Sequence, residues 1–173
     1  MFTSKLEETT MAQTTTPPAA PGGTRAGAPG GARALLDPPV LAVLGPALHA
    51  LLRIGAGLLF MQHGAQKLFG AFGGFGGTPG ATAELFSQMG LAGVLEFFGG
   101  LLIVVGLGTR LVAAVLVLLM LSAYVIAHLP QGGFPIENGG ELALLFALVW
   151  AFLVGNGAGP ASVDAALARR RRA

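Results

Sequence analysis

Four long apolar stretches, separated by short polar or glycine-rich segments, set the pattern of this chain. They cover residues of about 46–69, 91–107, 109–129 and 140–155, and the third carries no charge after its opening Arg110. A helix needs roughly 20 mostly apolar residues to cross a bilayer, and each stretch approaches that length. The second and fourth are the shortest. The pattern therefore predicts four transmembrane helices.

The charges outside these stretches fall on alternate connections. Basic residues precede the first stretch, lie in the short link after the second (Arg110) and follow the fourth (Arg169 to Arg172). The loops 70–90 and 130–140 contain neither Lys nor Arg. Because basic residues accumulate on the cytoplasmic side, the pattern places both termini in the cytoplasm. We expect an all-α fold, a four-helix transmembrane bundle in a bacterial inner membrane.

Composition supports this interpretation and divides the chain into three parts. With 53% hydrophobic and 10% charged residues, the chain is too apolar for an ordinary soluble domain. A soluble all-α protein would also not segregate its charges by loop. Residues 1–45 are rich in Thr, Pro, Ala and Gly, which predicts a disordered tail. Residues 46–167 form the predicted membrane domain, and residues 168–173 form a basic tail.

The first apolar stretch carries polar residues on one helical stripe. Arg53, Gly57, Phe60, Gly64 and Lys67 follow one another at spacings of four, three, four and three residues. A charge at the centre of a membrane helix costs about 2.5–3.5 kcal/mol, so both cations should face a neighbouring helix. The glycines would let that neighbour approach closely.

Polar residues of all four stretches share one depth under the predicted topology. This outer layer would hold Gln62, His63, Lys67, Glu96, His128 and Glu141. Arg53 lies closer to the cytoplasmic side, where Asp164 follows the fourth stretch, and the two are predicted to form an ion pair.

The outer polar layer has three interpretations. Its charges could simply fix the register of the helices. It could instead hold the headgroup of a small molecule or relay protons, because ionisable groups inside a membrane are functional candidates. A haem held between His63 and His128 is the third possibility. The chain has no Cys and three His, so we expect no metal centre of its own.

Several short motifs resemble those of the DoxX family of small four-span membrane proteins. They are R-x3-G-x6-G-x2-K-L from Arg53, E-x2-G from Glu96, G-L-x-T-R from Gly106, E-x-A from Glu141, and G-P-x-S-x-D from Gly159. The family takes its name from a subunit linked to thiosulfate:quinone oxidoreductase and a terminal quinol oxidase. Mycobacterial members of the family resemble proteins that take part in redox-stress complexes.

The resemblance implies an accessory membrane subunit of a quinone-linked oxidoreductase or redox-stress complex. The outer polar layer would then bind a quinone, with Glu96 or His63 exchanging protons and Lys67 bonding a carbonyl oxygen. The implied partners are the lipid bilayer and another protein of the complex; no nucleic-acid partner is expected. A non-enzymatic scaffold and a protein that handles lipids or other small molecules are the alternatives.

Overall fold

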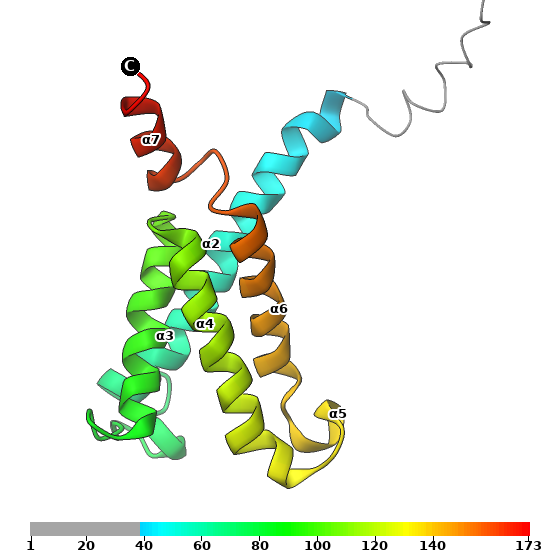
Figure 1. The fold of residues 1–173 in the computed structure, drawn as a ribbon. Helices are drawn as coiled ribbons and strands as arrows, with labels where there is room; N and C mark the ends of the chain where they lie inside the picture. The colour runs from blue at the N-terminus through cyan, green and yellow to red at the C-terminus, as the bar shows by residue number, and fades with distance from the viewer. Residues whose placement is uncertain (1–38) are drawn as a thin grey trace, which may run out of the picture. The chain divides into compact units, whose positions relative to one another are not determined.

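A computed structural model describes residues 39–173 of the chain, which are helical and contain no strand (Figure 1). Its four main helices are α2 (Pro39–Phe69), α3 (Gln88–Val105), α4 (Thr109–Ala123) and α6 (Glu141–Asn156). The prediction of an all-α fold is confirmed for these residues. Most of the predicted disordered tail, up to residue 38, lies outside the described residues.

Three helical segments are long and apolar enough to cross a membrane: Ala42–Phe69, Gln88–Val105 and Thr109–Gln131. The last of these exceeds α4 because the helix continues through a π-helical turn, η2 (Tyr124–His128), and a 3₁₀ turn, η3 (Leu129–Gln131). Helix α6 is apolar but shorter, with 16 residues.

The remaining short elements lie at the two ends of the main helices. The loop between α2 and α3 contains the 3₁₀ turn η1 (Phe75–Gly77), and α5 (Pro135–Asn138) precedes α6. We call this the loop end. At the opposite end, α3 and α4 are joined by a short link, and α7 (Val163–Arg170) follows α6 (Figure 1). We call this the link end.

The helices pack as two close pairs, α2 with α3 and α4 with α6, whereas the backbones of α2 and α6 lie farther apart and meet through large side chains such as Phe60 and Phe146. Glycines bring the backbones of α2 and α3 together. A Cβ on Gly100 would lie 2.9 Å from the carbonyl oxygen of Gly57, and a Cβ on Gly64 would clash with the backbone of Phe97. Small residues allow such close packing in membrane helices, as the glycine stripe predicts.

The described residues place apolar side chains outside and several polar ones inside. Leucines such as Leu58, Leu111 and Leu148 are exposed on different helices, whereas Arg53 and Glu96 are buried. This arrangement suits a bundle surrounded by hydrocarbon, where a polar group must find its partner inside the protein.

Two boundaries differ from the predictions. Helix α2 begins at Pro39, ahead of the predicted start near residue 46, and Pro46 lies inside the helix. A first-turn proline needs no N–H partner, so Pro39 fills that role, while Pro46 removes one internal hydrogen bond. At the other end of the chain, Arg169 and Arg170 belong to α7, so part of the predicted basic tail is helical.

Candidate functional site

A cavity of about 310 Å³ lies near the loop end, between α2, α3, the α4–η2 segment and α6. Four of the six residues predicted for the outer polar layer line it: His63, Lys67, Glu96 and His128. The rest of its wall is mostly apolar. A mostly apolar cavity with a few convergent polar groups, and a volume near the lower end of the usual 300–1,000 Å³, is typical of a small-molecule site.

An ion pair forms part of the cavity wall. The Lys67 Nζ lies 2.5 Å from the Glu96 Oε2, and the two side chains are 16% and 7% exposed. Lys67 comes from α2 and Glu96 from α3, so the expected contact between these antiparallel helices is present. A Cβ on Gly93 would lie 2.9 Å from the Cβ of Lys67. The absence of a side chain at Gly93 therefore lets the two charged groups meet.

The two histidines of the cavity have different surroundings. His63 is half-buried and lies edge-on to Phe146, with ring centroids 6.1 Å apart. His128 places its Nδ1 3.1 Å from the carbonyl oxygen of Asn138. A carbonyl oxygen only accepts, so this nitrogen carries a proton and the Nε2 remains able to accept one. His128 closes the π-helical turn, a feature often found at functional sites.

An aromatic cluster lies beside the polar groups. Phe60 and Phe146 line the cavity, and both contact Trp150, the single tryptophan of the chain. Phe146 stacks on Trp150 with centroids 5.7 Å apart, and Trp150 is fully buried. A molecule bound in the cavity would therefore lie one side chain away from the only indole.

Two residues predicted for the polar layer lie elsewhere. Gln62 is exposed on α2, and Glu141 is exposed at the start of α6, where it lines a separate shallow pocket with Leu145. Successive helical residues differ by about 100° in direction, so Gln62 points away when its neighbour His63 faces the cavity. Both residues lie near the cavity along their helices, but their side chains point away from it.

The predicted ion pair between Arg53 and Asp164 is not formed. The Arg53 side chain is buried, and its guanidinium donates to the carbonyl oxygens of Ile103 and Val104, at the end of α3, and to that of Ala161. The last carbonyls of a helix have no partner within the helix and carry partial negative charge. Arg53 therefore supplies hydrogen-bond donors and positive charge to the C-terminus of α3.

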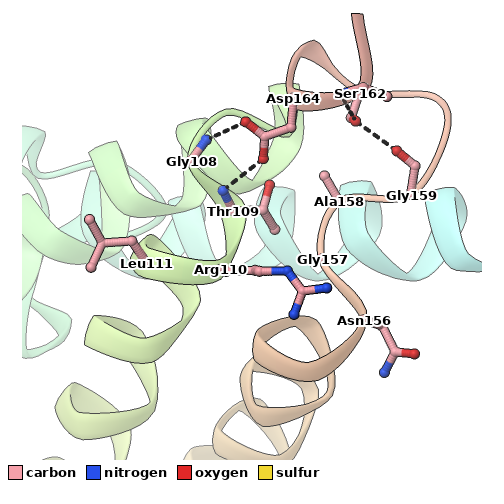
Figure 2. A pocket seen from close by; sticks show the side chains of 11 residues that line it. Gly108, Thr109, Arg110, Leu111, Asn156, Gly157, Ala158, Gly159, Ser162 and Asp164 are labelled. Carbon is pink, nitrogen blue, oxygen red and sulfur yellow. Dashed lines mark hydrogen bonds between the residues drawn. The ribbon is translucent and has the colours of Figure 1, made fainter. Parts of the chain in front are cut away.

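Asp164 binds the N-terminus of α4, where backbone N–H groups lack a partner within the helix (Figure 2). Its carboxylate accepts hydrogen bonds from the backbone N–H groups of Gly108, at 2.8 Å, and Thr109, at 3.0 Å. Partial burial alone would raise the pKa of this carboxyl group. The N–H groups of Thr109 and Gly108, with the positive charge of Arg53, outweigh that effect and hold the pKa below its usual value.

Arg110 also binds a helix end. Its Nη1 donates to the carbonyl oxygens of Val154 and Gly155, both at 2.7 Å, near the C-terminus of α6. Figure 2 shows Arg110 beside the surface groove of about 490 Å³ that Asp164 also lines. The charged side chains of this groove are engaged by helix termini. We therefore assign the groove a structural role and regard the cavity at the loop end as the candidate site.

Sequence reasoning missed two residues that shape the cavity. Asn138 is buried, accepts from the N–H of Gly140 and donates to the carbonyl oxygen of Gly132, which fixes the loop that carries the His128 contact. Phe146 joins the cavity to the aromatic cluster. The signal available for Asn138 was its position before two glycines, which is typical of a turn. Phe146 has no signal within an apolar helix.

Comparison with known proteins identifies the family. The model of the DoxX family matches residues 48–129, which include Lys67, Glu96 and His128. A protein of Haemophilus influenzae described as "Uncharacterized protein" is 38% identical over 122 residues, which cover 69% of this chain and 90% of that protein. No solved structure matches. The chain therefore belongs to the DoxX family, and its apolar helices make it a multi-pass integral membrane protein.

Proposed function

We propose that the chain crosses a bacterial inner membrane four times, with both termini in the cytoplasm. The fourth span is α6, which packs along α4. Its 16 residues extend about 24 Å at ~1.5 Å per residue, so the hydrocarbon layer of about 30 Å would be completed by the adjoining loop residues. The link end carries Arg110 and the basic residues of α7, whereas the loop end carries Glu84 and Glu137.

Reporter fusions after residues 78, 134 and 173 test this topology. Because basic residues favour the cytoplasm, the fusion after 173 should be active as a cytoplasmic reporter and the other two as periplasmic reporters. A cytoplasmic signal after residue 78, or an exported C-terminus, would contradict the four-span arrangement.

We further propose that the cavity binds the headgroup of a membrane quinone. The observation that carries this proposal is the ion pair in the cavity wall, since a donor and an acceptor meet there at one edge of an apolar space. The Lys67 ammonium would donate to a carbonyl oxygen of the headgroup, and the Glu96 carboxylate would accept from the hydroxyl of the reduced form. His63 and His128 could pass protons to or from the same space.

A bound quinone would supply two-electron redox chemistry, which the side chains of this chain lack. The residues of the cavity would bind the headgroup, orient it and provide the route for its protons. We therefore infer that the protein is an accessory membrane subunit, with a partner protein completing a quinone-linked oxidoreductase or a redox-stress complex. The family membership supports this role.

A non-enzymatic scaffold is the second candidate. The observation in its favour is that Lys67 and Glu96 neutralise each other, so the pair could serve only to fix α2 against α3. The arginine-rich segment from Arg169 to Arg172 would then offer a contact for a partner. A protein that handles lipids or other small molecules would use the same cavity for a different headgroup.

Quinone binding to the purified protein tests the proposed function. A quinone near Phe60 and Phe146 should quench the fluorescence of Trp150, and a soluble benzoquinone without a tail provides the probe. Replacing Lys67→Met and Glu96→Leu together removes both polar partners, so the affinity should fall by more than about tenfold, the equivalent of one lost hydrogen bond. Gln62→Leu, at the same depth but outside the cavity, is the matched control and should bind normally.

The same preparation separates the alternatives. Extracted quinone and saturable quenching support the proposal. A Soret absorption band would point to the haem alternative instead. If the protein carries neither group, and quenching is equal in the wild-type protein and the double variant, the scaffold is favoured.

A further inference from the structure

An apolar groove of about 410 Å³ lies between α2 and α6, whose backbones lie farther apart than those of the two close pairs. Leu52, Gly55 and Leu59 contribute from α2, and Leu145 and Val149 contribute from α6. Several of these leucines are strongly exposed. In a membrane, the groove would therefore open directly to the lipid.

The groove adjoins the polar cavity. Leu142 and Phe146 of α6 line both spaces. The glycine contacts close the seam between α2 and α3, and α4 packs along α6. The contact between Phe60 and Phe146 lies where the cavity and the groove adjoin, so Phe146 forms a wall common to the cavity and a lipid-facing surface. A molecule with its polar end beside Lys67 and Glu96 could extend over Phe146 into this groove.

We propose that the groove holds the apolar tail of the molecule whose headgroup occupies the cavity, the polyprenyl tail of a membrane quinone. This inference rests on the proposed function and specifies its ligand as a tailed quinone that enters sideways from the bilayer. The tail would lie against the leucines of α2 and α6 while the headgroup reaches the ion pair.

The charges argue against a phospholipid as the occupant. A phosphate headgroup needs cations that are free to bind it, whereas the cavity holds one ammonium group already paired with a carboxylate. Arg53 and Arg110 donate to carbonyl oxygens at the link end of the bundle. An uncharged headgroup that exchanges hydrogen bonds with the Lys67–Glu96 pair fits the cavity better.

Gly55 offers a direct way to fill the groove. It lines the groove, and a Cβ added there would meet no atom within 4 Å, so a side chain can leave the backbone at this position and extend into the groove. Gly155, in α6, also has open space around its Cβ but does not line the groove. Gly55→Phe and Gly155→Phe are therefore a matched pair, since both place the same ring on an apolar helix.

The experiment measures quenching of Trp150 in lipid nanodiscs by two quinones with the same headgroup, one without a tail and one with several isoprene units. Gly55→Phe should weaken binding of the tailed quinone by about tenfold, because the ring occupies the space of the tail. The tail-less quinone should bind within about twofold of the wild-type affinity. Gly155→Phe should bind both as the wild-type protein does.

The outcomes separate this inference from the proposed function. If the tailed quinone binds Gly55→Phe as tightly as the wild-type protein, the groove does not hold the tail and the inference is wrong, while headgroup binding stands. If neither quinone binds the wild-type protein, the proposed function fails and the inference falls with it. A different result would also overturn the inference: Gly55→Phe loses a phospholipid that co-purifies with the wild-type protein, yet binds the tailed quinone as tightly as before. The groove would then hold a phospholipid and not the quinone tail.

Discussion

Replacing Arg53 by methionine is expected to lower the free energy of unfolding by about 3–5 kcal/mol, the cost of removing one partner of a buried charged contact. Arg53 is 1% exposed, and its guanidinium donates to three carbonyl oxygens, at Ile103, Val104 and Ala161. Methionine fills a similar volume but leaves these acceptors without a donor, at about 1–3 kcal/mol for each unsatisfied group. Unfolding in detergent, followed by circular dichroism, measures the loss.

Two further variants identify the cause of that loss. Arg53→Lys keeps the charge but lacks the planar fork, so it should recover only part of the stability. Arg110→Met removes a similar contact at the end of α6, but that side chain is exposed and water or headgroups can replace it. It should therefore cost less. An Arg53→Met protein as stable as the wild type would show that the helix-end contacts contribute little.

Removing only Lys67 should be nearly as damaging, and removing its partner as well should restore most of the stability. Lys67→Met leaves the Glu96 carboxylate, 7% exposed, without its cation, and breaking such a pair costs about 3–5 kcal/mol. Glu96→Leu should cost less, because the longer Lys67 side chain is 16% exposed and can turn its ammonium toward water. The double variant replaces the pair by apolar side chains and should lie close to the wild-type stability.

A double-mutant cycle on the detergent-solubilised protein measures this coupling. Lys67→Met, Glu96→Leu and the double variant are compared with the wild-type protein by thermal unfolding. Losses that simply add would mean that the two charges contribute independently, contrary to the geometry. A stable double variant is also the sample in which loss of quinone binding can be attributed to the site rather than to unfolding.

The helices and the polar residues of the candidate site could be predicted from the sequence. Hydrophobic runs mark membrane helices directly, so α3, α4 and α6 begin within a few residues of the predicted starts. Depth along each helix follows from topology and residue count alone. Depth alone therefore predicts one layer for His63, Lys67, Glu96 and His128, and all four line the cavity.

The direction of each side chain and its hydrogen-bond partners depend on how the helices pack, and the depth of a residue in the membrane does not determine them. Gln62 and Glu141 lie at the predicted depth, but the rotation of their helices turns them away from the cavity. Arg53 and Asp164 were paired because each lacked an obvious partner of opposite charge. Their real partners are backbone groups at helix ends, which every sequence contains and no residue letter marks.

The contact between Arg53 and the end of α3 also bears on how the chain enters the membrane. A lone α2 would carry an unpaired guanidinium into the hydrocarbon, at a cost that reaches about 2.5–3.5 kcal/mol at the centre of a span. The carbonyl oxygens that relieve this cost belong to the next helix, at Ile103 and Val104. We therefore expect the two helices to leave the translocon together as a hairpin, because the end of α3 supplies the hydrogen-bond acceptors that Arg53 of α2 needs.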